Sequence, residues 1–265
     1  MKLSAYINGL GVLGPGLASW PDAAAVLAGR QVYRPAPTVL PMPTILAAAE
    51  RRRTGRVVKL ALGIALEATA HAGEDPATLA SVFSSSGGDG QNCHELCQAL
   101  SIASREISPT RFANSVHNAA AGYWSIGTGA MVESNMLCAF DASFTAGLLE
   151  AMTQVAVDGI PVMLVAYDSE YPPPLHAKRP IPDAFGVALV LTPGRRQSSL
   201  ARMDAALTDS SCDLLSDPAL EALRCSCPAA RSLPLLRLLA QRRSGSAILE
   251  YLDVSQLEVR IEPCA

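Results

Sequence analysis

The sequence predicts an α/β fold in which helices cover a mixed β-sheet. Apolar runs typical of strands alternate along the chain with segments whose apolar residues recur at helical spacing. This order implies strands joined by crossover helices. The segment 142–157 is apolar on nearly every side, apart from two Thr, one Glu and one Gln. Such a segment is typical of a helix that is buried on more than one face.

The first elements follow from local signals. An apolar run at 5–12 predicts a strand, and 21–28 predicts a short helix for which Ser19 is a suitable N-cap. Four prolines between residues 34 and 43 exclude both a helix and a central strand there. Helical spacing at 54–71 predicts a longer helix, which Gly73 ends.

The middle of the chain continues the alternation of strands and helices. A strand is expected at 79–83, followed by the Ser- and Gly-rich loop 84–90 and a helix at 92–104. Further helices are expected at 118–128 and 142–157, and further strands at 133–139, 161–166 and 184–191, the last two around the Pro-rich loop 171–182.

The last part of the chain differs in character. Residues 197–232 are polar and have no clear period, whereas 233–241 reads as a helix and 247–252 with 257–261 as a hairpin. We therefore divide the chain into a main domain, residues 1–192, and a small helix-hairpin tail, residues 193–265.

Composition excludes several classes of protein. A chain of 265 residues that is 49% hydrophobic can bury a substantial core. Its net charge of −3 disfavours a nucleic-acid partner, which requires a clustered positive surface. No apolar run reaches the length that crosses a membrane. The seven cysteines, an odd number without a disulfide framework, indicate a reducing compartment, so a cytoplasmic protein is expected.

Three short motifs could suggest ligands, and each has a structural interpretation. Gly9–Gly14 matches a GxGxxG pattern but is broken by Pro15-Gly16 and lacks the following acidic residue of a dinucleotide site. Cys93, His94 and Cys97 have no clear second ligand pair except Cys225 and Cys227, so we expect buried free thiols rather than a metal site. The basic run 50–59 reads as a solvated helix start, with docking of an acidic partner as the alternative. No cofactor is expected.

Two stretches carry a resemblance to a known family. Asn118-Ala-Ala-Ala-Gly122 resembles the Asn-x-Ala-Ala-Gly helix start of β-ketoacyl synthases, and Ala139-Phe-Asp-Ala-Ser143 resembles their nucleophile motif Thr-Ala-Cys-Ala-Ser. The resemblance implies the N-terminal half of a thiolase-like fold. It also places Asp141 at the position of the catalytic cysteine, and the half that carries the two catalytic histidines is absent. The resemblance thus implies that the surrounding ketosynthase motifs are kept, whereas aspartate replaces the cysteine nucleophile.

This resemblance implies a chain-length factor, a non-catalytic subunit that pairs with a complete β-ketoacyl synthase and shapes its acyl pocket in fatty-acid or polyketide (aryl-polyene-like) biosynthesis. A heterodimer through strand 133–139 and the segment 109–118 is expected, and binding of acyl carrier protein is a further expectation. The residues expected at the interface and pocket are Phe112, Asn118, Asn135, Met136, Leu137 and Phe140.

An enzymatic alternative uses other side chains of the same region. Cys138 or Ser143, with His117 as base, could serve a small acyl hydrolase or transferase, but no Gly-x-Ser-x-Gly elbow surrounds either nucleophile. In the structural interpretation, Asn118 and Asp141 cap helices, His117 fixes the loop before its helix, and Cys138 is a packed strand residue. We therefore expect no catalysis by the chain alone.

Overall fold

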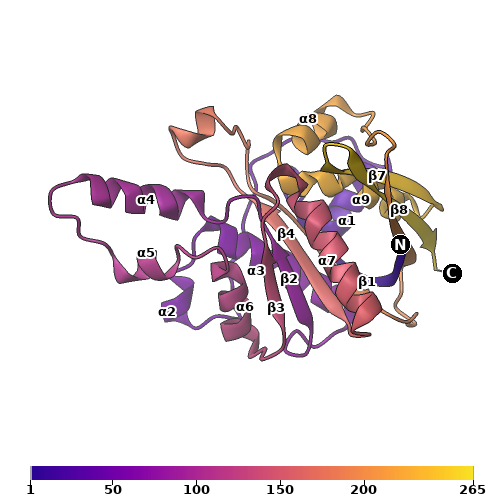
Figure 1. Ribbon diagram of the computed structural model, residues 1–265, viewed down its shortest axis with the longest axis horizontal. Helices are drawn as coiled ribbons and strands as arrows, with labels where there is room; N and C mark the ends of the chain where they lie inside the picture. The colour runs from indigo at the N-terminus through magenta and orange to yellow at the C-terminus, as the bar shows by residue number, and fades with distance from the viewer. Residues whose placement is uncertain (1, 265) are drawn as a thin grey trace.

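A single mixed sheet forms the centre of the computed structural model, which describes residues 2–264 (Figure 1). Its strand order is β3-β2-β4-β5-β1-β6-β8-β7. The strands are β1 (Leu3–Leu13), β2 (Ala80–Ser84), β3 (Ser134–Leu137), β4 (Val162–Asp168), β5 (Phe185–Thr192), β6 (Ala201–Thr208), β7 (Gly245–Leu252) and β8 (Ser255–Pro263). β2 is parallel to both β3 and β4, and the remaining pairs are antiparallel. The predicted mixed sheet is confirmed.

The helices cover both faces of this sheet (Figure 1). On one face, α7 packs on β4, β2 and β1 in a core that it shares with α1 and α9, and on the other α3 packs on β1 and β5 beside α6. α4 and α5 form an arm that extends from the body (Figure 1). The helices are α1 (Trp20–Leu27), α2 (Ala48–Arg51), α3 (Arg56–Ala72), α4 (Gly90–Ser101), α5 (Pro109–Ala113), α6 (Ala119–Thr128), α7 (Ser143–Val157), α8 (Pro218–Ser226) and α9 (Leu233–Gln241).

Local signals in the sequence set several element ends. The amide of Asp22 donates to Ser19 Oγ over 3.3 Å, so Ser19 is the N-cap of α1 as predicted. Gly73 ends α3 in the left-handed region, at φ +68°. Gly9 and Gly11 let β1 approach α3, because a Cβ on either would collide with the helix carbonyl of Ala68 or Ile64. These glycines therefore serve strand–helix packing.

The last part of the chain joins the sheet rather than hanging from it. β6 pairs with β1 on one side and β8 on the other, and α8 forms within the polar stretch. The sequence shows no clear period in 197–232 and predicts no element there, yet β6 and α8 form, because burial against the sheet overrides the weak local pattern. The 3₁₀ helix η3 (Pro228–Ser232) is buried and packs against α7. η3 also contacts β4 and β5, so this part of the chain lies beside α7 on the same face of the sheet.

The predicted edge strand is present but shorter than expected, covering Ser134–Leu137 instead of 133–139. It lies at one end of the strand order and pairs only with β2. None of the described helices has both the length and the apolar character needed to cross a membrane.

Candidate functional site

The turn between β3 and α7 holds the residue at the expected nucleophile position. After β3, Phe140 adopts a φ of +51°, which is uncommon for a residue with a side chain. A 3₁₀ turn, η1 (Phe140–Ala142), follows, and α7 begins at Ser143. No side chain caps α7, so the expectation that Asp141 is its N-cap is wrong.

The Asp141 carboxylate is instead held by two arginines from distant parts of the chain. Arg179 Nη2, in the loop after β4, lies 2.5 Å from Oδ1, and Arg231 Nη2, in η3, lies 3.0 Å from Oδ2. Arg231 is 9% exposed and Asp141 35% exposed. Each carboxylate oxygen is therefore engaged by a guanidinium group in a site that is only partly open to water.

These contacts continue into a charge network at the start of α7. Arg231 also pairs with Glu250 on β7, and Arg224 on α8 lies 3.8 Å from the same carboxylate. Arg224 donates two hydrogen bonds to Glu221, which lower the pKa of that carboxyl to about 2. The charges alternate in sign, so the network neutralises itself internally.

The exposed ring of Phe140 is part of the same arrangement. The guanidinium carbon of Arg179 lies 3.9 Å from the centroid of this ring, which is cation–π geometry. Arg179 therefore holds both Phe140 and Asp141, and it ties the loop after β4 to the turn. An aspartate fixed in this way has no thiolate chemistry and cannot carry an acyl group as the cysteine of a synthase does.

The side chains proposed for an enzymatic alternative do not form a catalytic pair. Ser143 is buried, and its Oγ donates to the Phe140 carbonyl (2.7 Å) and accepts from the Ala139 amide (3.1 Å). His117 Nε2 lies 3.1 Å from the Ser85 carbonyl oxygen, and the Cys138 thiol donates to the Ser86 carbonyl at 3.2 Å. Within residues 2–264, no hydrogen bond joins His117 to Ser143 or Cys138. Cys138 is exposed, so its prediction as a packed residue is wrong.

A buried carboxylate that sequence reasoning missed lies just behind this turn. Asp168 ends β4 and accepts from the Ser86 amide (2.8 Å), the Ser86 hydroxyl (2.6 Å) and the Ala229 amide (3.0 Å). It thus joins the loop after β2 to η3. Burial raises the pKa of Asp168 to about 6, although these hydrogen bonds oppose the shift. The only signal in the sequence was an acidic residue at the end of an apolar strand.

The remaining predicted site residues lie along one side of the molecule. Asn135 is exposed and donates to Glu150 (3.1 Å), Met136 and Leu137 are half-buried, and Phe140 is exposed. Phe112 on α5 is 67% exposed. The β3 residues and Phe140 thus sit together at the sheet edge, with Phe112 on the arm (Figure 1).

Asn118 occupies the N-cap position of α6 as predicted, but its side chain makes no capping hydrogen bond. It is exposed and lines a hollow of about 460 Å³ between α5 and α6. Val116 and Ile126 also line this hollow, and both are more than half exposed. The hollow is therefore partly apolar and open to solvent.

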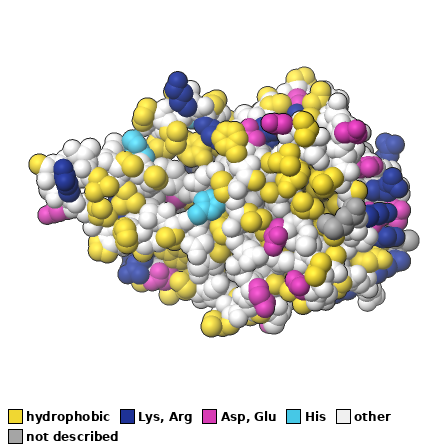
Figure 2. All heavy atoms as spheres, viewed as in Figure 1, with side chains coloured by type: hydrophobic (Ala, Val, Ile, Leu, Met, Phe, Trp, Pro, Cys, Tyr) yellow, Lys and Arg dark blue, Asp and Glu magenta, His cyan; other side chains and the backbone are white. Residues whose placement is uncertain are grey.

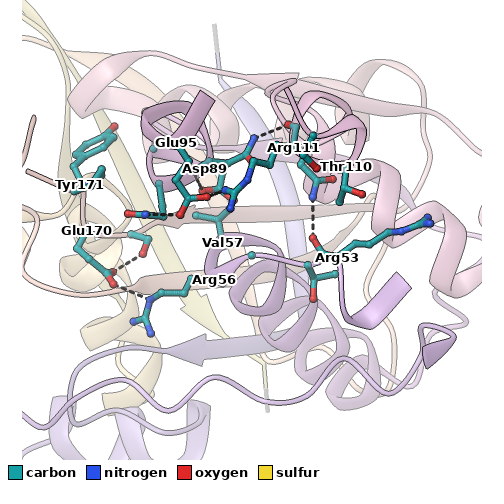
Figure 3. A pocket seen from close by; sticks show the side chains of 18 of the residues that line it. Arg53, Arg56, Val57, Asp89, Glu95, Thr110, Arg111, Glu170 and Tyr171 are labelled. Atoms are coloured by element: carbon teal, nitrogen blue, oxygen red, sulfur yellow. Dashed lines mark hydrogen bonds and ion pairs between the residues drawn. The ribbon is translucent and has the colours of Figure 1, made fainter. Parts of the chain in front are cut away.

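A cavity of about 690 Å³ lies between the start of α3, the arm and the loop 169–173 (Figure 3). Its basic groups are largely paired: Arg56 with Glu170 (2.7 Å) and Asp183 (2.8 Å), and Arg111 with Glu95. Burial raises the pKa of Asp89, which lies in the same cavity. Because most of its arginines are paired with carboxylates, this cavity is a weak anion site, and the basic run 50–59 presents only part of its charge.

Cys93 and Cys97 on α4 are exposed, so their expected burial is wrong. In the described part of the chain, no three His, Cys, Asp or Glu side chains gather as a metal site would require.

Comparison with known proteins agrees with this architecture. The family model for the β-ketoacyl synthase N-terminal domain matches residues 23–246, well past residue 192. None of the curated proteins compared with the chain matches it.

Several solved structures share the fold. A complex of a ketosynthase (ApeO) with its chain length factor (ApeC) from Xenorhabdus doucetiae aligns over 97% of this chain and 99% of that chain, with 24% identity and a TM-score of 0.73. The ishigamide ketosynthase/chain length factor aligns over 99% and 100%, with 12% identity and a TM-score of 0.73. The complex AntDE:AntF, a type II acyl-carrier protein with its ketosynthase, aligns over all of both chains, with 10% identity and a TM-score of 0.77.

The solved structures agree in fold at low identity, and the family model covers most of the sequence. The retained Asn118–Gly122 helix start and the β3–α7 turn lie inside the matched range. The chain belongs to the β-ketoacyl synthase N-terminal domain family.

Proposed function

We propose that this protein is a chain-length-factor subunit, which has no condensing activity alone and pairs with a complete β-ketoacyl synthase. The observation that carries the proposal is the Asp141 carboxylate, locked between Arg179 and Arg231 at the position where the family keeps its nucleophile. The ketosynthase frame around that position is retained. Two of the similar structures are described as ketosynthases with a chain length factor.

The sheet edge at β3 supports a partner on that side. Glu133 and Leu137 direct their carbonyl groups at β2, accepting from the amides of Ser81 (3.0 Å) and Ser85 (3.2 Å). Because strand residues alternate in direction, the backbone groups of Ser134 and Met136 face the open edge. An edge of this kind is a template for pairing with another strand.

Exposed apolar side chains surround the same edge. Figure 2 shows such side chains over the α4–α5 arm and in front of the sheet. Between residues 112 and 140 the exposed apolar residues are Phe112, Val116, Ile126, Met131, Val132 and Phe140. A monomer rarely keeps so many large apolar groups in one region, so we infer that they form the core of the partner interface.

The α4–α5 arm has a proposed role at the acyl pocket of the partner. We propose that Phe112, on α5, reaches the partner's pocket and limits the length of the growing chain. Acyl carrier protein is a further proposed partner of the complex.

The seven free cysteines support a reducing compartment, and we place the protein in the cytosol. The products belong to fatty-acid or polyketide biosynthesis, of the aryl-polyene type.

Co-expression with a complete β-ketoacyl synthase tests the proposal. The tagged protein should retain the synthase through gel filtration, and the purified complex should condense carrier-bound malonate whereas the isolated protein should not. A stable interface should bury more than about 2,000 Å² and be largely apolar. A monomer that never binds the synthase and never changes its products would contradict the proposal.

A further inference from the structure

A second hollow, of about 760 Å³, lies between the ends of α1 and α9 and the start of α8. α9 packs on β7 and β8, and Gly245 of β7 lines the hollow; these two strands are at the opposite end of the sheet from β3 (Figure 1). The hollow is therefore separate from both the Asp141 network and the proposed synthase interface. Its volume is within the range of small-molecule sites.

Three arginines line this hollow without an acidic partner. Arg30, Arg237 and Arg243 make no ion pair with any described residue, and the one side-chain hydrogen bond among them is a long one, 3.4 Å, from Arg30 to the Ala24 carbonyl. By contrast, Arg56, Arg224 and Arg231 each pair with carboxylates. Arg34 lines an adjoining hollow that shares Val26, Gln31 and Val32 with the first.

Helix dipoles do not cancel this charge. The last residues of α1 and α9 contribute roughly −0.5 each and the start of α8 roughly +0.5. Asp217, the only acidic side chain among the described residues that line the hollow, adds −1, and its Oδ1 accepts hydrogen bonds from the amides of Ala219 and Leu220. Against three guanidinium groups the sum is about +1.5, so a net positive field remains on a chain whose overall charge is −3.

The shape and the residue types indicate the ligand. Guanidinium groups bind phosphate oxygens through paired, charge-assisted hydrogen bonds, more tightly than they bind singly charged groups. Leu27, Leu220 and Leu238 give the same hollow an apolar wall. A concave site that combines the two suits a small molecule that has a phosphate group and an apolar part, rather than the broad face of a protein.

We propose that this hollow, lined by Arg30, Arg237 and Arg243, binds a phosphate-bearing small molecule. Binding there would not require the synthase, since the site and β3 lie at opposite ends of the sheet. The site thus goes beyond the proposed chain-length role, and either could fail while the other holds.

Isothermal titration of the full-length protein with pyrophosphate and with adenosine diphosphate tests this directly. Pyrophosphate should bind saturably and raise the melting temperature, whereas sodium chloride at the same ionic strength should not. Tighter binding of adenosine diphosphate would show that the apolar wall contributes. Pyrophosphate binding of equal affinity would assign the site to the phosphate groups alone, which also supports the proposal.

Substitutions locate the binding. Arg243 lies just beyond α9. Arg243→Gln should weaken pyrophosphate binding by roughly tenfold, because one charge-assisted contact is lost. Arg237→Lys keeps the charge on α9 and should weaken it less. Arg105→Gln, on the arm and without an ion pair, removes the same charge far from the hollow and should change nothing. No saturable binding by the wild type, or equal losses in Arg243→Gln and Arg105→Gln, would overturn the proposal.

Discussion

Arg231 Nη2 lies 3.0 Å from Asp141 Oδ2, so the residue at the nucleophile position of the retained frame is bound to the 3₁₀ helix η3, far along the chain. The same 3₁₀ helix packs against α7 and against β4 and β5. The residue at the nucleophile position and η3 are thus parts of one arrangement. η3 packs beside α7 and also supplies a cation that fixes Asp141.

Replacing Asp141 should cost more stability than the loss of a helix cap. Asp141→Ala leaves the buried Arg231 without one of its carboxylates, and we expect a loss of about 2 kcal/mol in the free energy of unfolding, below the value for a fully buried pair because Asp141 is partly exposed. Asp141→Asn keeps one acceptor and should lose less. Urea unfolding measures both, with the exposed Asp253→Ala as control.

The same variants separate structure from chemistry. Asp141→Asn in the complex with the synthase should keep most of the condensing activity, since its role is to position the turn. A fall of several orders of magnitude with folding intact would instead show that Asp141 takes part in the reaction.

Asp168 should make stability depend on pH in a defined window. Its pKa is raised from an ordinary 3.8 to about 6 in the fold, so between these values the unfolded chain has already lost the proton that the folded protein retains. Its contribution is therefore full below about pH 4, is lost as pH rises through 6, and amounts to about 3 kcal/mol. Urea unfolding of the wild type and Asp168→Asn at pH 4 to 7 should show their difference changing in this window. A constant difference would contradict the raised pKa.

The enzymatic alternative makes an opposite prediction for Cys138 and Ser143. In our account, Cys138→Ala leaves the turnover of carrier-bound malonate by the complex unchanged. Ser143→Ala costs about 1 kcal/mol of stability, because its hydroxyl bonds to two backbone groups of the turn. Turnover by the isolated protein that either substitution abolishes would establish a catalytic chain.

Phe112 should control product length without holding the subunits together. It is exposed on the short helix α5 and is one of six exposed apolar residues assigned to the interface, so Phe112→Ala removes bulk while the other five still hold the subunits together. The complex should survive gel filtration and release longer products, as measured by mass spectrometry. Val157→Ala removes an equally exposed apolar side chain at the far end of α7 and should leave the products unchanged. Products of unaltered length in Phe112→Ala would exclude this role.

Much of the fold could be predicted because its elements have strong local signals. The periodic apolar residues of α3, the Ser19 cap and the all-round apolar α7 each fix an element independently of its surroundings. β6 and α8 were missed because their polar residues show no period. They form because pairing with β1 and burial of Leu220 and Leu223 stabilise them within the whole protein.

The site was only half predictable for a related reason. Asp141 could be placed by the resemblance, but its partners Arg179 and Arg231 lie 38 and 90 residues further along the chain, as their numbers show. No local pattern reports a contact over such a separation. In the sequence, a carboxylate just before a helix indicates an N-cap. Only the tertiary structure shows that Asp141 pairs with two arginines instead.

The pairing of β3 with a synthase is the central claim, and the mass of the complex by light scattering tests it most directly. Ser134→Pro removes an outward-facing amide at the start of the strand and keeps the backbone hydrogen bonds between β3 and β2, although the side-chain hydrogen bond from Ser81 Oγ (3.0 Å) is lost. Leu137→Arg places a charge on the strand. When either variant is mixed with the synthase, light scattering should give the masses of the separate proteins and no heterodimer. Val254→Arg, which adds the same charge at the exposed β7–β8 turn, should leave the heterodimer mass intact. A heterodimer that forms equally well with Ser134→Pro and Leu137→Arg would contradict the account.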